Sequence, residues 1–104
     1  MTGFDDRKKA FEEKFAHDAE MQFRVEARRN KLLGLWAAEL MGMSGEEAQA
    51  YALSVVKADF QEAGDEDVFR KVAADLGDKA SEADIRARMA DLRELAKEQI
   101  MNES

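Results

Sequence analysis

The sequence predicts an all-α protein: a four-helix bundle-like domain that begins with a long N-terminal helical region. The 104 residues contain no proline, and they are rich in Ala, Glu, Lys, Leu and Met, which favour helices. Apolar residues recur at helical spacing along most of the chain. A chain of this length has enough residues for one domain with one modest core.

The first helical region is expected to run from Phe4 to about Leu40. Its beginning is highly charged, and its few apolar anchors are aromatic: Phe4, Phe11 and Phe15 fall within a stripe of roughly 40° on a helical wheel. The apolar face that follows lies on another side of the helix, so we expect a kink or hinge at residues 17–23. The beginning of the region is therefore an arm that is too poor in apolar residues to fold alone.

Three more helix starts follow this region. A serine with an acidic residue three positions later is a capping-box pattern, which satisfies free amides of the first turn. An aspartate alone can also serve as an N-cap, and a glycine commonly follows the last residue of a helix. The expected starts are Ser44 with Glu47, Asp65, and Ser81 with Asp84, and the expected ends of the first two of these helices are Gly64 and Gly77.

The expected core lies on the apolar faces of these helices. Because the connecting loops are short, neighbouring helices should run roughly antiparallel. A tryptophan at the centre of such a core needs a hydrogen-bond partner for its indole N–H if it is fully buried. The residues expected to form the structural core are Leu32, Trp36, Leu40, Tyr51, Val55, Phe60, Phe69 and Leu92.

The composition argues against several classes of function. The chain has no cysteine and a single histidine, His17, so neither a cysteine-ligated metal nor a typical zinc site can form. No nucleophile and base lie in an arrangement typical of catalysis, and we expect no enzyme. A net charge of −7 argues against nucleic-acid binding, which depends on phosphate neutralisation. No apolar run approaches the roughly 20 residues that cross a bilayer, and we expect a cytoplasmic protein.

One basic cluster stands out from the acidic chain. Its members are Arg24, Arg28, Arg29 and Lys31. These side chains could contact a nucleotide phosphate or an acidic partner surface. They could equally form a solvated helix face on which Glu20 and Arg24 pair across one turn. The solvated face is favoured over phosphate binding, because no glycine-rich loop accompanies the cluster to supply backbone amides.

Three strings of residues carry a resemblance to a known family. They are Phe4-Asp5-Asp6-Arg7, the segment EKFAHD at residues 13–18, and ARRNKLLGLWAA at residues 27–38. With these strings the chain resembles the zeta subunit family, the small natural inhibitors of the F-type ATP synthase in alphaproteobacteria. The resemblance extends across the four-helix body to the C-terminal helix.

The resemblance implies a mechanism in which the arm is the inhibitory element. In this family a mobile, intrinsically disordered N-terminal arm becomes ordered on the catalytic head of the synthase. It wedges between catalytic and non-catalytic subunits, reaches toward the central rotor and blocks ATP hydrolysis. Residues 1–20 would then be the arm and residues 21–104 the body. The residues expected to bind the partner are Phe4, Asp5, Arg7, Lys8, Phe11, Lys14, Phe15 and Asp18.

The resemblance also bears on ligands. No cofactor is required, although some family members bind ADP or ATP weakly, and contact with the membrane comes only through the synthase. The alternative function is a small helical module that senses ADP or ATP through the basic cluster. Two further alternatives concern the arm: its aromatic stripe could pack back on the bundle, and His17 could sense pH or be a bystander on a polar face.

Overall fold

The structure is a computed structural model that describes residues 3–59 and 65–103, with side chains from residue 6 onward. Its described part consists of α-helices and one short 3-10 turn, so the predicted all-α class is confirmed. The elements are α1 (Gly3–His17), α2 (Ala19–Leu40), α3 (Gly45–Ala58), α4 (Glu66–Leu76), η1 (Gly77–Lys79) and α5 (Glu82–Glu103).

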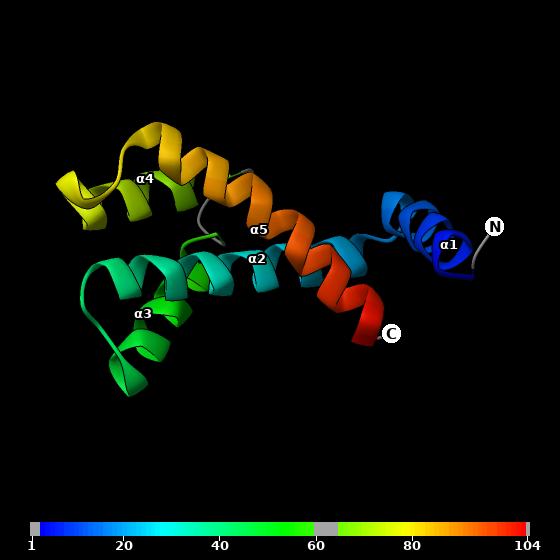
Figure 1. The fold of residues 1–104 in the computed structure, drawn as a ribbon, viewed down its shortest axis with the longest axis horizontal. Helices are drawn as coiled ribbons and strands as arrows, with labels where there is room; N and C mark the ends of the chain where they lie inside the picture. The colour runs from blue at the N-terminus through cyan, green and yellow to red at the C-terminus, as the bar shows by residue number, and fades with distance from the viewer. Residues whose placement is uncertain (1–2, 60–64, 104) are drawn as a thin grey trace.

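The long helix α2 is the centre of the molecule. It packs against α3, α4 and α5, and α5 runs antiparallel to it along much of its length. Figure 1 shows α3 and α4 at one end of α2, while α1 lies at the opposite end beside its N-terminus. The chain is therefore elongated, with the N-terminal helix and the C-terminus of α5 at the same end.

Gly34 allows α2 and α3 to approach each other closely. A Cβ atom at this position would lie 2.6 Å from the Cα atom of Ala52 and 3.2 Å from Cγ2 of Val55. The first distance is shorter than real Cβ contacts and the second is tight, so the hydrogen of glycine fits between the two helices where a methyl group would require a shift. This contact fixes where α3 crosses α2.

The apolar interior consists of two clusters, one at each end of α2. The main core lies where α2, α3, α4 and α5 meet, and it contains Leu33, Ala37, Val55, Val68, Phe69, Val72, Leu76, Ile85 and Met89. The second cluster lies where α1, α2 and α5 meet, and it contains Phe11, Met21, Val25, Ala96, Ile100 and Met101. We call this second cluster the end cluster.

The structure corrects part of the expected core. Leu40, the last residue of α2, is 40% exposed and is not among the residues that pack on the main core, so its placement in the core is wrong; the next residue, Met41, packs there instead. Trp36, Tyr51 and Leu92 are half-buried residues packed against the edge of the main core. The remaining members are Leu32, half-buried against the end cluster, Val55 and Phe69, buried in the main core, and Phe60, which lies outside the described residues.

The helix boundaries agree with the sequence signals unevenly. The Ser81 box forms, since Oγ of Ser81 accepts a hydrogen bond from the backbone N–H of Asp84 at 3.0 Å. At Ser44 the backbone is extended as in a cap, but its side chain makes no capping hydrogen bond, so that box is wrong. Helix α3 ends at Ala58, while the expected end at Gly64 lies outside the described residues.

Helix α4 ends where the sequence predicts, but the side-chain cap predicted at its start is absent. Gly77 follows the helix with φ of +56°, a left-handed backbone that favours glycine, and the predicted end is confirmed. Asp65 precedes the first residue of α4 but makes no side-chain cap. Its carboxylate is instead bound by Arg29, because a buried guanidinium requires a charged partner.

Candidate functional site

A single residue, Asp18, separates α1 from α2. Its backbone is extended (φ −112°, ψ 102°), and its side chain accepts a hydrogen bond from the backbone N–H of Met21 at 3.1 Å. On the other side of the break, Nε2 of Gln22 donates to the carbonyl oxygen of Phe15 at 2.7 Å, which satisfies a free carbonyl in the last turn of α1. The break expected at residues 17–23 is thus confirmed as a capped joint between two helices.

The aromatic face of α1 lies against the body. Phe11 is 8% exposed and packs in the end cluster with Ala96, Ile100 and Met101 of α5. Phe15 is half-buried beside this cluster, with its ring stacked on that of Phe11 at a centroid separation of 6.2 Å. For Phe11 and Phe15, the alternative that the aromatic stripe packs on the bundle is what this structure shows, and the mobility expected of residues 1–20 stays a prediction.

Polar contacts from α5 surround these aromatics. Nζ of Lys97 lies 3.1 Å from Oε2 of Glu12 and 4.9 Å from the centroid of the Phe15 ring. The guanidinium of Arg93 lies 5.7 Å from the same ring. Nη2 of Arg7 donates to the backbone carbonyl of Met101 at 3.1 Å. Two cations near the Phe15 ring, one ion pair and one hydrogen bond to the backbone therefore hold α1 on α5.

The other residues expected in the inhibitory element take different positions. Lys8 and Lys14 are exposed to solvent. Asp18 is half-buried and caps α2, so its carboxylate is occupied in this structure. The backbone of Phe4 and Asp5 belongs to α1, but their side chains lie outside the described ones.

The four members of the basic cluster do not converge. Arg24 and Lys31 are exposed, while Arg28 donates to both carboxylate oxygens of Glu103 at 2.6 and 2.9 Å. This hydrogen bond raises the pKa of Arg28 and lowers the pKa of Glu103. Among the described residues no ion pair joins Glu20 to Arg24, so that expected pair is wrong; the charge of Arg24 acts on Glu103 instead.

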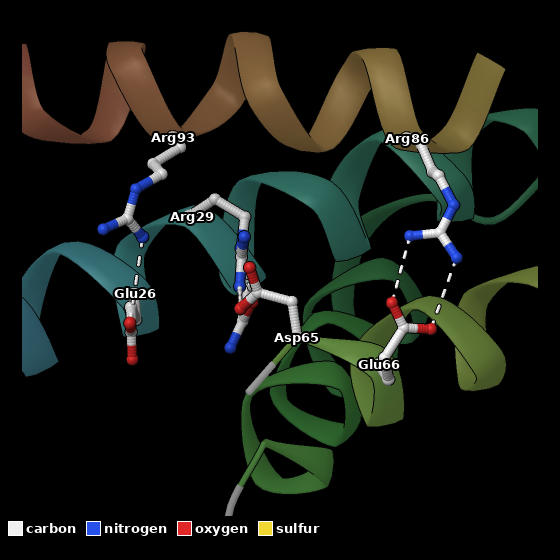
Figure 2. Close-up of polar contacts among 7 residues, drawn as sticks. Glu26, Arg29, Asp65, Glu66, Arg86 and Arg93 are labelled. Carbon is white, nitrogen blue, oxygen red and sulfur yellow. Dashed lines mark hydrogen bonds and ion pairs between the residues drawn. The ribbon is translucent and has the colours of Figure 1, made fainter. Parts of the chain in front are cut away.

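Arg29 belongs to the interior. It is 1% exposed, its Nε donates to Oδ1 of Asn30 at 2.7 Å, and its Nη2 lies 2.9 Å from Oδ1 of Asp65 (Figure 2). The hydrogen bond from Arg29 lowers the pKa of Asp65, whereas burial raises the pKa of the nearby Asp59. These contacts join α2 to the residues on both sides of the α3–α4 connection, which is a structural role.

A cavity of about 310 Å³ next to Arg29 contains further arginines. Arg86 binds Glu66 through two hydrogen bonds of 3.2 and 3.3 Å, and Arg93 lies 3.8 Å from Glu26 (Figure 2). Because each of these guanidinium groups faces a carboxylate, the positive charge of the cavity is neutralised. This arrangement does not favour the binding of an anion.

Sequence reasoning missed the residues of α5 that face α1. Arg93 and Lys97 are four residues apart and therefore lie on one side of the helix, next to the buried residues Ala96 and Ile100. This spacing was the signal available for them. It could not show that α1 would be their neighbour, because the partner Glu12 lies 85 residues away in the chain.

The described residues form neither a metal site nor a membrane-spanning helix. No group of three or more histidine, aspartate or glutamate side chains in residues 3–59 and 65–103 could hold a metal ion. In the same ranges, no helix combines the length and apolar character required to cross a membrane. Among the described residues, the contact between α1 and α5 is therefore the candidate functional site.

Comparison with known proteins identifies the family. A family model described as ATPase inhibitor subunit zeta matches residues 1–99. A structure titled "Solution NMR structure of the protein" shares 61% sequence identity with this chain, covers 81% of it and 99% of its own length, and superposes with a TM-score of 0.76. No curated protein matches. Because the family model spans nearly the whole chain, including α1, this protein belongs to the ATPase inhibitor subunit zeta family.

Proposed function

We propose that this protein inhibits ATP hydrolysis by the F-type ATP synthase, with residues 1–20 as the inhibitory element and residues 21–104 as its anchor. One observation carries the proposal. The family match begins at residue 1 and so includes α1, an aromatic-faced helix joined to the body through the single residue Asp18. The partner surface is the catalytic head, where catalytic, non-catalytic and rotor subunits meet.

The energetics of α1 suit a helix that changes partner. A helix of 15 residues is marginal in water by itself, so α1 needs an apolar surface to cover its aromatic face. Phe11 and Phe15 lie four residues apart, which is the spacing of anchors for a helix bound in a groove. Each phenylalanine contributes roughly 1.5–3 kcal/mol when it is buried. A groove on the synthase head could supply the same burial that α5 supplies here.

The charged residues of the arm would add contacts outside the groove. Lys8 and Lys14 are exposed in the present structure and are available to an acidic surface of the partner. Arg7 donates to a backbone carbonyl of α5, and it would lose this hydrogen bond when the arm inserts into the synthase. Phe4 and Asp5 complete the expected set. We propose no catalytic role and no required cofactor for this protein, and any contact with the membrane would come through the synthase.

Nucleotide sensing is less well supported than inhibition. Of the expected basic cluster, Arg29 is buried and Arg28 is paired with Glu103, so the four residues do not form one phosphate site. Weak binding of ADP or ATP stays a prediction from the resemblance. Titration of ADP into the free protein checks it.

The test of the inhibitory element is ATP hydrolysis by the purified synthase head, titrated with full-length protein and with the 21–104 fragment. We expect saturable inhibition by the full chain and none by the fragment, with circular dichroism showing that the fragment keeps its helices. In the full chain, Phe15→Ala should weaken binding, but by less than the roughly 1–3 kcal/mol of an interface anchor, because the same substitution also removes the contacts of Phe15 with the body in the free protein. Leu53→Ala, at an exposed position of α3, is the matched control. Full inhibition by the fragment would refute the assignment of the arm.

A further inference from the structure

The aromatic face of α1 would contact two different surfaces, one in the free protein and one on the synthase. In the proposed function this face enters a groove of the synthase, while in the structure it covers Ala96, Ile100 and Met101 of α5. Phe11 cannot be buried in both places at once. The docked and the inserted positions of α1 are therefore mutually exclusive.

Lys97 is placed to control the docked position. Its side chain is 15% exposed and lies between an acidic residue and an aromatic residue of α1, with Nζ 3.1 Å from Glu12 and 4.9 Å from the ring centroid of Phe15. A second carboxylate, Glu94 of α5, lies 3.9 Å from the same nitrogen. One cation thus holds α1 by charge and by its position over the ring.

The docking is incomplete, which suits a reversible contact. A cleft of about 400 Å³ remains between α1 and α5, and its lining includes Phe11, Leu95 and Met101. Phe11 of α1 packs in the end cluster, which is separate from the main core. Helix α1 can therefore leave α5 while the packing of α2, α3, α4 and α5 in the main core is retained.

We propose that the contact of α1 with α5 is an intramolecular latch that competes with the synthase for the aromatic face. This inference rests on the proposed function and adds its regulation. The apparent affinity of a binding element equals its intrinsic affinity multiplied by the fraction of time for which the element is available. A latch that is open about a tenth of the time therefore lowers the affinity about tenfold. Opening the latch strengthens inhibition without any new contact to the synthase.

The latch itself is tested in the free protein by hydrogen exchange of the α1 amides, without any synthase. Lys97→Glu places a carboxylate against Glu12, and we expect α1 to exchange at least about threefold faster because the open fraction rises. The reversed pair, Glu12→Lys with Lys97→Glu, restores the attraction and should return exchange toward the original rate. Lys79→Glu makes the same charge change on η1 and serves as the control. Unchanged exchange in Lys97→Glu would overturn the latch.

Competition is tested by titrating the Lys97→Glu and Lys79→Glu proteins into the same ATP hydrolysis assay. We expect the half-inhibitory concentration to fall by at least about threefold for Lys97→Glu and to stay unchanged for Lys79→Glu. Faster exchange combined with unchanged or weaker inhibition would overturn the competition. Failure of the original protein to inhibit would instead refute the proposed function, and the exchange result would still establish whether α1 is held by Lys97. Melting curves of each variant show whether the body is intact.

Discussion

Replacing Arg29 by methionine should destabilise the body of the protein without acting on the arm. Methionine keeps most of the apolar stem but removes the guanidinium, so Oδ1 of the buried Asn30 loses the donor at 2.7 Å. Leaving a buried polar atom without a partner costs roughly 1–3 kcal/mol. The carboxylate of Asp65 also loses its ion pair, but its side chain is 49% exposed and regains water, so this loss adds less than about 1 kcal/mol. We expect a total of about 1–4 kcal/mol.

The measurement is urea unfolding followed by circular dichroism, with the free energy extrapolated to water. Arg24→Met changes an exposed arginine of the same helix and should stay within about 0.5 kcal/mol of the original protein. Arg29→Lys keeps the charge but not the forked geometry, and it should lie between the two. A loss below about 0.5 kcal/mol in Arg29→Met would refute the structural role and return Arg29 to the candidates for ligand binding.

Two more predictions concern the body. Gly34→Ala should destabilise the protein by roughly 1–2 kcal/mol, because strain against the backbone of Ala52 outweighs the higher helix propensity of alanine, and a higher melting temperature would contradict the close approach. Asp59→Asn should stabilise the protein at neutral pH, because burial raises the pKa of this carboxyl, and ionisation therefore costs stability in the folded state. The difference should be absent below about pH 4, where the aspartate is protonated in both states, and should grow as the pH rises through the raised pKa. Unfolding curves at several pH values test this, and a pH-independent difference would contradict it.

Helix positions were largely predictable because their signals are local. The Ser81 box and the Gly77 stop lie within a few residues of the ends they mark, and both are present in the structure. The misaligned apolar faces of the first region predicted a break, and Asp18 provides it. The Ser44 and Asp65 signals failed as side-chain caps, and at Asp65 a stronger, charged partner from another helix accounts for the failure.

The candidate site was predictable only in part. The spacing of Phe11 and Phe15 left two uses open, binding to a partner and packing on the bundle. The structure shows the second, in which both rings lie against the end cluster, and partner binding stays a prediction. Sequence reasoning treated Arg29 as a member of a surface cluster, since no local pattern distinguishes a buried arginine from a solvated one. Its partner Asp65 lies 36 residues away, and the partner of Glu12 lies 85 residues away.

The sequence by itself determined the helical class and the break between arm and body, because helix periodicity and capping act over three to seven neighbouring residues. It also carried the three strings of residues that resemble the zeta subunit family. Tertiary structure alone decided that Arg29 joins the core, that Leu40 remains exposed and that Lys97 faces the arm. These outcomes depend on which helix faces meet in space. The contacting faces determine which side chains are buried and which charges are paired, because the stability of a charge or an apolar surface depends on its neighbours in the folded protein.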